Sequence, residues 1–238
     1  MNKKREAVFN RSKTAEKGDF LREAIFGLND GLVSTLSLLA GLSGALVDNW
    51  IIVISGLAEI IAGSISMGLG AYISMKSELE YYKNQIEKEK KSIAIVPNIE
   101  VEEIMDVYIK KGFTKKEAKE IVNKIIKNKR SWLETLLHEK VWVGKIGEDP
   151  KKLGLTNGLA FVLGGTFPIL PFIFLETSYP LFIGTLFALI ILFIVGSIKS
   201  KYTGKNWFSS GLELSIITLI AASLSYFAGR LINIFIGG

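Results

Sequence analysis

The stretch Gly56-Leu-Ala-Glu59-Ile-Ile-Ala-Gly63-Ser-Ile-Ser-Met67-Gly-Leu-Gly70-Ala-Tyr72 decides the fold of this chain. It lies inside an apolar run from about Trp50 to Met75, which is long enough to cross the hydrocarbon core of a bilayer. The run nevertheless contains the carboxylate of Glu59, and a carboxylate is costly at membrane depth. The stretch therefore predicts a membrane-spanning helix that carries a functional polar side chain.

One face of this predicted helix combines two kinds of metal ligand. Ser55, Glu59, Gly63 and Met67 recur every four residues and so share that face. The carboxylate and the thioether are about 12 Å apart along the helix axis, with a glycine gap between them. Oxygen suits hard cations, and sulfur tolerates softer transition metals. We therefore expect this face to line a path for a divalent metal.

Ordinary structural roles are open for the same residues. A methionine in an apolar helix usually fills space in the core, so Met67 alone favours packing over metal binding. A structural role for Glu59 would require a buried partner for its charge. Small residues in a spanning helix usually allow close helix packing. Those of this stretch are Ala62, Gly63, Ser66, Gly68 and Gly70.

Composition places the chain among polytopic membrane proteins. Of its 238 residues, 49% are hydrophobic, and the formal net charge is +6. The mean hydropathy is +0.34, and long uncharged runs alternate with charged segments. There is no cysteine, which excludes disulfides and thiolate metal sites. The basic charge lies in the tail and loops, so no nucleic-acid partner is predicted.

We predict an all-α protein with five transmembrane helices and a helical module between spans two and three. A basic tail (1–18) precedes an amphipathic helix and spans one and two (19–75), the module covers 76–147, and spans three to five cover 148–238. The spans are predicted at about 29–46, 50–75, 153–175, 179–198 and 208–235. Pro168 and Pro171 are expected to break or kink span three.

Local signals predict where the helices outside the membrane begin and end. Asp19 is a plausible N-cap for the amphipathic helix, and Pro97 should end the continuation of span two. Three short amphipathic helices are expected in the module. They are 100–111, capped by Asn98 and stopped by Gly112; 115–128, with a Thr114/Glu117 capping box; and 132–143, with a Ser131/Glu134 capping box.

The placement of basic residues predicts the orientation in the membrane. The N-terminal tail, the module and the loop 199–205 are rich in Lys and Arg, whereas the two other loops carry only Asp48 and Glu176. Lys and Arg are enriched in cytoplasmic loops. We therefore expect the N-terminus and the module in the cytosol and the C-terminus outside or in a lumen.

Three blocks together resemble the vacuolar iron transporters, in particular the plant-type members. The blocks are 28–44 (LNDGLVSTLSLLAGLSG), 56–72 as quoted above, and 162–171 (VLGGTFPILP). The resemblance runs from about Phe20 to near the C-terminus. It implies a five-span homodimer with a cytosolic metal-binding module. It also implies proton-coupled export of ferrous iron, and often manganese, into a vacuole-like lumen.

The resemblance also implies roles for residues inside the spans. Asp30 matches the first-span carboxylate of the translocation path, and Glu59 and Met67 match its second-span carboxylate and thioether. From the residues alone, Asp30 is equally suited to cap the first span, with Gly31 after it. Three hydroxyls that follow it would add neutral oxygens, although hydroxyls in spans more often bond their own helix. They belong to Ser34, Thr35 and Ser37.

In the module, the resemblance implies metal ligands at Glu89, Glu100, Glu103 and Glu139. From the residues alone, glutamates on basic amphipathic helices are more often a solvated face. The chain also departs from the family pattern, because Ser92 replaces an expected glutamate and Leu136-Leu137 replaces a Met-Met pair. His138, the single histidine, could substitute as an imidazole ligand beside Glu139.

The predicted function is export of a divalent transition metal, Fe²⁺ or also Mn²⁺, from the cytosol by exchange for protons. Apart from the transported or bound metal, no cofactor is predicted. The alternative is a membrane-anchored metal sensor or scaffold without transport. A di-iron enzyme is disfavoured because it needs paired Glu-x-x-His motifs, and Glu134 lies four residues before His138 rather than three. The physiological metal, the coupling ion and the receiving compartment stay open.

Overall fold

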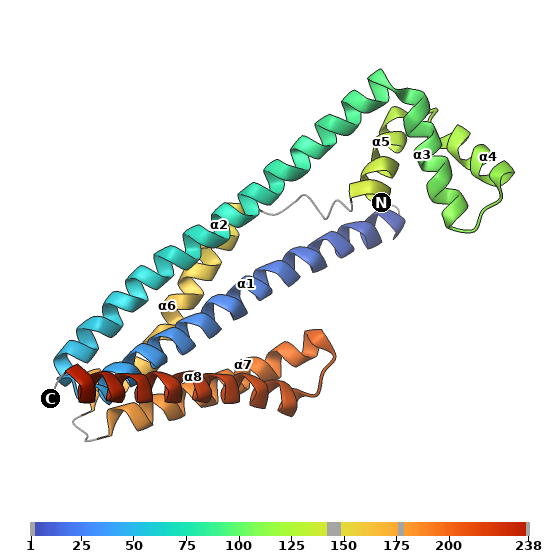
Figure 1. Cartoon of the computed structure of the whole chain (residues 1–238). Helices are drawn as coiled ribbons and strands as arrows, with labels where there is room; N and C mark the ends of the chain where they lie inside the picture. The colour runs from blue at the N-terminus through green and yellow to red at the C-terminus, as the bar shows by residue number, and fades with distance from the viewer. Residues whose placement is uncertain (1–2, 142–148, 176–178, 237–238) are drawn as a thin grey trace. The chain divides into compact units, whose positions relative to one another are not determined.

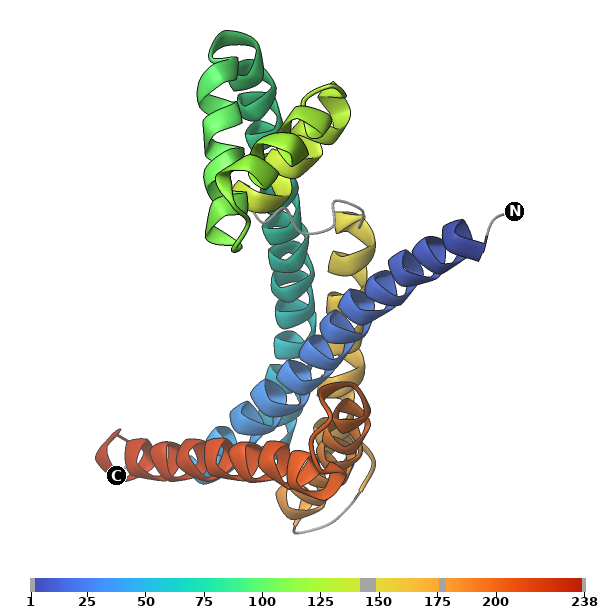
Figure 2. The ribbon, with the colours of Figure 1, turned by 90° about the vertical axis from the view of Figure 1, so that its right-hand side faces the viewer.

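The computed structural model describes residues 3–141, 149–175 and 179–236 of the chain. Within these residues the protein is entirely helical (Figure 1 and Figure 2), which confirms the predicted all-α class. The helices are α1 (Lys3–Gly44), α2 (Asn49–Ile95), α3 (Pro97–Lys110), α4 (Lys115–Ile125), α5 (Lys129–Leu136), the π-helical turn η1 (Leu137–Val141), α6 (Pro150–Phe174), α7 (Pro180–Thr203) and α8 (Trp207–Ile236).

Five helices are long and apolar enough to cross a membrane, which confirms the predicted number of spans. The candidate spans are Gly18–Gly44 in α1, Asn49–Ile95 in α2, Pro150–Phe174 in α6, Pro180–Lys201 in α7 and Trp207–Phe235 in α8. Helices α1 and α2 continue far beyond the predicted spans, back to Lys3 and on to Ile95, because the flanking segments are also rich in good helix formers.

The chain divides into two compact units. The first, the spanning unit, consists of Met1–Ile73 and Asp149–Gly238, and the second, the module, is Ser74–Glu148. The module has its own small apolar core, in which Ile104, Val122, Trp132 and Leu136 from α3, α4 and α5 are buried. Since one helix, α2, contributes to both units, the first boundary, between Ile73 and Ser74, falls inside a continuous helix.

Helix α1 is the central element of the spanning unit, where it packs against α6, α7 and α8. Its residues Leu32, Leu36 and Ala40 are buried in one apolar cluster with residues of α7 and α8. On another side, Leu39 joins a second cluster with residues of α2 and α6. In Figure 1 and Figure 2, α7 and α8 form a hairpin that lies beside α1.

Backbone contact between α1 and α6 depends on glycines in both helices. A Cβ added at Gly31 would lie 2.2 Å from the Phe161 carbonyl oxygen, and one at Gly164 would lie 2.2 Å from the Leu28 carbonyl oxygen. No real side-chain atom fits at such distances, so only glycine permits this approach. The pair of close contacts sets the position of α1 on α6.

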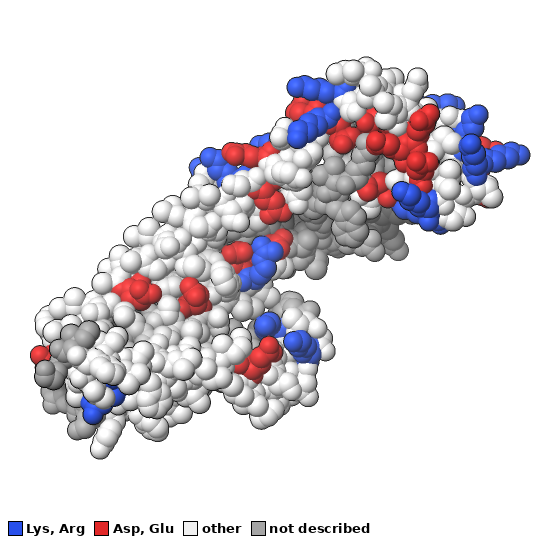
Figure 3. Space-filling model, viewed as in Figure 1, with Lys and Arg blue, Asp and Glu red and all other residues white. Residues whose placement is uncertain are grey.

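The outer surface of the spanning unit is apolar. Large side chains such as Ile61, Ile65 and Leu69 on α2 and Leu159 on α6 are more than half exposed. Figure 3 shows charged side chains crowded over the module, while those on the visible face of the spanning helices are few and scattered. Exposed apolar side chains are expected where the surrounding solvent is lipid.

The N-terminal segment differs from the prediction. Instead of a tail followed by a helix capped by Asp19, α1 is one helix from Lys3 to Gly44, and Asp19 lies inside it. Asp19 pairs with Arg22 three residues later, at 3.3 Å. The segment before Asp19 contains strong helix formers such as Lys, Glu and Ala, so the apolar helix extends through it.

Of the predicted helix boundaries in the module, one capping box and one glycine stop are confirmed. The Thr114 hydroxyl accepts a hydrogen bond from the Glu117 amide, and the Glu117 carboxylate accepts hydrogen bonds from the Thr114 amide and hydroxyl. These bonds to its charged form lower the pKa of Glu117. Gly112, with φ of +97°, follows Lys111, the C-cap of α3.

Two other predicted caps were wrong. Asn98 lies inside α3, which begins at Pro97 because proline fits the first turn of a helix, where its missing N–H is not needed. Ser131 does not begin a capping box. Instead, the Asn128 side chain caps α5 by accepting hydrogen bonds from the Arg130 and Ser131 amides, and Glu134 pairs with Arg130.

Pro168 and Pro171 were expected to break or kink span three, and they do not break it, since α6 is continuous through both residues. Both prolines are buried. Neither can donate a hydrogen bond to the carbonyl four residues earlier, which belongs to Gly164 for Pro168 and to Phe167 for Pro171. Proline is tolerated in spanning helices where neighbouring groups satisfy the freed backbone atoms.

The α1–α6 contact gives a stability prediction. Gly164→Ala should destabilise the protein by about 1–3 kcal/mol, because its Cβ meets backbone atoms that cannot rotate away. Gly18→Ala in α1 is the control, since nothing lies within 4 Å of the added Cβ. Thermal midpoints in detergent measure the effect, and equal midpoints for the two variants would contradict the proposed contact.

Candidate functional site

Two carboxylates lie inside apolar helices of the spanning unit. Asp30 is a half-buried residue in the interior of α1, and Glu59 is a half-buried residue of α2. The alternative of Asp30 as an N-cap was wrong, because α1 begins far before it at Lys3. Asp30 therefore occupies a position where a carboxylate contributes nothing to helix capping.

The two carboxylates are close enough to repel each other. Within the described residues, neither forms an ion pair with a lysine or arginine. The structural alternative for Glu59, a buried partner of opposite charge, therefore has no support in this part of the chain. Two repelling carboxylates between apolar helices form an arrangement that a bound cation stabilises.

The predicted glycine gap between Glu59 and Met67 is filled. A Cβ at Gly63 would lie 2.2 Å from the ring of Phe161, which is 1% exposed. The same residue meets Gly31 of α1 through its carbonyl oxygen, at 2.2 Å from an added Cβ. Phe161 of α6 thus lies where α1, α2 and α6 meet, at the level between the carboxylate and the thioether. Gly63 therefore has the close-packing role that was weighed for it in the sequence analysis.

The small residues of α2 divide into two groups. Gly63 and Gly68 allow close packing, since a Cβ at Gly68 would lie 3.0 Å from the Gly154 carbonyl oxygen. On another side of α2, Ala58, Ala62 and Ser66 are exposed, together with Gly70, where nothing lies within 4 Å of an added Cβ. The second group is thus exposed on the surface of the described part of the chain.

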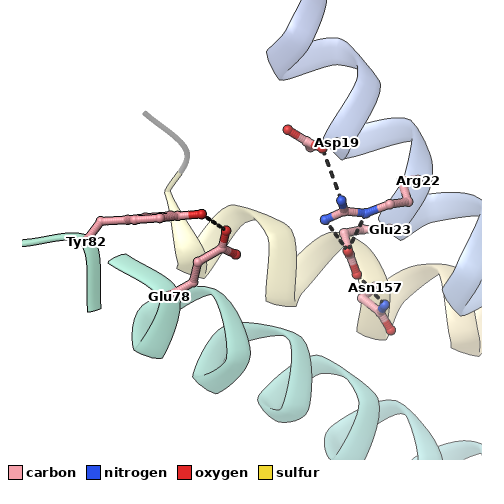
Figure 4. Close-up of polar contacts among 6 residues, drawn as sticks. All are labelled: Asp19, Arg22, Glu23, Glu78, Tyr82 and Asn157. Carbon is pink, nitrogen blue, oxygen red and sulfur yellow. Dashed lines mark hydrogen bonds and ion pairs between the residues drawn. The ribbon is translucent and has the colours of Figure 1, made fainter. Parts of the chain in front are cut away.

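A hydrogen bond between Glu23 and Asn157 links α1 and α6 (Figure 4). The Asn157 side chain, on a residue 1% exposed, donates a hydrogen bond to Glu23 Oε2 at 2.8 Å. Glu23 also accepts from Arg22, which pairs with Asp19. The sequence analysis did not single out Glu23 or Asn157. Glu23 lies seven residues before Asp30 and shares its helix face, so this spacing could have revealed it.

The module residues predicted as metal ligands have other partners in this structure. Glu100 of α3 is 3% exposed and accepts a hydrogen bond from the Ser92 hydroxyl of α2. Glu139 of η1 pairs with Lys111. His138 lies 3.8 Å from the Glu139 carboxylate through Nδ1, and its side chain is 86% exposed. In Figure 4, Glu78 and Tyr82 of α2 form a further hydrogen bond at 3.0 Å.

Glu89 is half-buried on α2 and Glu103 is exposed on α3. Across the described residues, no three His, Asp or Glu side chains are placed to hold one metal ion. Glu100 is thus hydrogen-bonded to Ser92, and Glu139 is paired with Lys111. In the described part of the module, the predicted ligands do not come together around one position. The set of Glu89, Glu100, Glu103, His138 and Glu139 stays a prediction.

Comparison with known proteins gives a consistent match over almost the whole chain. The model of the VIT family matches residues 21–230. Vacuolar iron transporter 1 of Oryza sativa subsp. japonica is 34% identical over 213 residues, which are 88% of this chain and 84% of that protein. Vacuolar iron transporter 1 of Arabidopsis thaliana is 32% identical over 220 residues, 91% and 87% of the two chains. The vacuolar iron transporter of Plasmodium berghei (strain Anka) is 28% identical over 226 residues, 90% and 83%.

The position of Phe161 gives a second stability prediction. Phe161→Ala should destabilise the protein by about 3–5 kcal/mol, because it removes a buried ring and leaves a cavity between three helices. Leu159→Ala, two residues away on α6, is the control, since Leu159 is 57% exposed. The thermal midpoint in detergent is the measurement. Similar midpoints for both variants would show that the ring does not fill the space at Gly63.

Proposed function

Because this chain belongs to the VIT family, we propose that it exports Fe²⁺, with Mn²⁺ as a second cargo, from the cytosol in exchange for protons. Its curated relatives are vacuolar membrane transporters, so the protein is an integral membrane transporter of metal ions and not an enzyme. The receiving compartment would be a vacuole-like lumen or the cell exterior.

The observation that carries the proposal is the pair of repelling carboxylates, Asp30 and Glu59, inside apolar helices. A divalent cation bound between them would neutralise both charges. Protons would neutralise them as well, so metal and protons compete for the same oxygens. If the site binds either the metal ion or protons but not both at once, transport of the metal in one direction is coupled to transport of protons in the other. The exchange mechanism follows from this competition.

Met67 would give the path its preference among metals. Its thioether lies two turns beyond Glu59 on the same face, and sulfur favours Fe²⁺ and other transition metals over Mg²⁺ and Ca²⁺. Phe161 at the intermediate level would separate the two ligands as a hydrophobic barrier until the helices move.

The proposed orientation places the N-terminus and module in the cytosol. Arg22 of α1 and Lys199 of α7 line one cavity, so the start of the span Gly18–Gly44 and the end of the span Pro180–Lys201 lie on the same side of the spanning unit. The excess of basic residues at such ends is typical of the cytosolic side. The C-terminus, after a fifth span, would then lie outside or in the lumen.

The proposed assembly is a homodimer. The exposed face of α2 formed by Ala58, Ala62, Ser66 and Gly70 has the small-residue spacing that lets two spanning helices approach closely. Because Ala58 directly precedes Glu59, this face lies about 100° around α2 from that carboxylate.

We further propose that the module captures metal through Glu89, Glu100, Glu103 and Glu139, with His138 as an accessory ligand. Metal binding would then have to displace Ser92 from Glu100 and Lys111 from Glu139. The alternative function, a metal sensor without transport, needs only this capture. A sensor without transport would give no role to Asp30 and Glu59, and for this reason we favour transport.

Flux through liposomes tests the transport proposal. Wild-type protein should take up Fe²⁺ and Mn²⁺ faster when a pH gradient is imposed, and Asp30→Asn or Glu59→Gln should reduce uptake to the level of protein-free liposomes. Glu213→Gln is the control, because Glu213 is an exposed residue of α8 that pairs with Lys205 at 3.8 Å. Flux that ignores the gradient would indicate a channel, and wild-type flux in Glu59→Gln would contradict the proposed path.

Equilibrium Mn²⁺ binding tests the module. Lys111→Met should tighten binding about threefold, because it removes a cation that competes for Glu139. Lys110→Met is the control, since Lys110 is the exposed residue directly before Lys111. Both variants are made in an Asp30→Asn, Glu59→Gln background, and bound Mn²⁺ is measured by electron paramagnetic resonance. Identical affinities would remove Glu139 from the ligand set.

A further inference from the structure

Three hydroxyls that follow Asp30 on α1 are buried and have no hydrogen-bond partner among the described residues. They are Ser34 Oγ, Thr35 Oγ1 and Ser37 Oγ. Thr35 is fully buried, with 0% of its surface exposed. All three lie within one turn of helix, inside the span Gly18–Gly44. A buried hydroxyl without a partner is unfavourable, and more so in a bilayer, where water cannot reach it.

Many serine and threonine hydroxyls elsewhere in the described spanning helices form a hydrogen bond with a carbonyl of their own helix. Serine and threonine in a helix usually donate to the carbonyl four residues earlier. Such bonds are formed by Thr166 to Val162, Thr185 to Leu181, Ser197 to Phe193, Ser215 to Gly211 and Thr218 to Leu214. Apart from the three on α1, the only buried unpaired hydroxyl in the described spans is that of Ser210 on α8. The unpaired hydroxyls are thus concentrated directly after Asp30.

Helix geometry places two of these hydroxyls on the face of Asp30. Ser34 and Ser37 follow Asp30 by four and seven residues, which corresponds to the same face at about 6 Å and 10 Å along the axis. Thr35 lies on another side of α1, where α1, α2 and α6 meet. Its Oγ1 is 2.7 Å from the position of a Cβ at Gly165, and Ile60, the residue after Glu59, lies 2.7 Å from the same position.

From these positions we propose that the hydroxyls of Ser34, Thr35 and Ser37 are oxygen ligands that carry the divalent cation from Asp30 toward the Gly44 end of α1. The proposal rests on the transport function proposed above. Two carboxylates supply at most four oxygens, whereas hard divalent cations usually take six or more. Neutral oxygens complete the shell without adding charge. Because they bind weakly, they also let the ion leave, which conduction requires.

The first test compares transport with stability in the variant Ser34→Ala, Ser37→Ala. The variant should transport Mn²⁺ about tenfold more slowly than wild type at saturating metal, as for loss of groups that support a metal site. Its thermal midpoint should be equal to or higher than that of wild type, because the substitutions remove unpaired buried polar atoms. Thr35→Val should behave in the same way.

Ser215→Ala is the matched control, since the Ser215 hydroxyl donates to the Gly211 and Leu189 carbonyls at 3.1 and 3.2 Å. It should transport at the wild-type rate and unfold at an equal or lower temperature. Wild-type flux in the double variant would overturn the inference while leaving the transport function intact. Absence of flux in the wild-type protein itself would overturn both.

The second test asks whether the hydroxyl touches the ion. Because the chain has no cysteine, Ser34→Cys introduces a single thiol of similar size, and a thiol binds soft cations far better than a hydroxyl does. Cd²⁺ should inhibit Mn²⁺ flux in this variant at concentrations at least about tenfold lower than in wild type. Ser215→Cys should show no such sensitisation. Equal Cd²⁺ sensitivity of Ser34→Cys and wild type would overturn the role as a ligand.

Discussion

Backbone contact between α1 and α6 is the constraint on which the spanning unit depends. Lipid gives no hydrophobic driving force for helix association, so close packing must hold the helices together. Gly31 and Gly164 allow each helix to touch the backbone of the other. This contact buries one side of α1 and leaves Asp30 half-buried at the edge of the interface. A bulkier residue at either glycine would move the carboxylate as well as weaken the packing.

The same contact explains why α2 can place Glu59 near Asp30. Phe161 meets Gly31 with its carbonyl oxygen and Gly63 with its ring, so one residue of α6 contacts both α1 and α2. Its ring lies on the helix face that carries Glu59 and Met67, one turn from each. Packing and permeation are therefore linked, because the ring that joins the three helices also separates the two ligands. Metal movement past this level requires the ring or the helices to shift.

The fold could be predicted because it depends on strong local patterns in the sequence. The site could be predicted only in part, because it also depends on contacts between residues on different helices. Five apolar runs, the Thr114/Glu117 capping box and Gly112 are local signals, and the structure confirms them. Asp30 also suits a helix start, and only the extension of α1 back to Lys3 excludes that role. The filling of Gly63 by Phe161 and the pairing of Ser92 with Glu100 join residues far apart or on different helices. No pattern in either segment alone reveals such contacts, since each depends on how the helices pack.

The polar residues of α1 illustrate how a transporter can combine binding with release. A carboxylate pair binds a divalent cation strongly, and an ion held only by such groups would leave slowly. The hydroxyls after Asp30 are neutral, buried and unpaired, so an ion that reaches them keeps some of its oxygen contacts but loses the full charge attraction. Leaving these hydroxyls unpaired lowers the stability of the folded protein. Hydrogen bonds from the hydroxyls to carbonyls of their own helix would have avoided this loss. Sites with such a cost are often functional, because selection for packing alone would remove them. We therefore infer that the unpaired hydroxyls after Asp30 mark the part of the path where the ion is released.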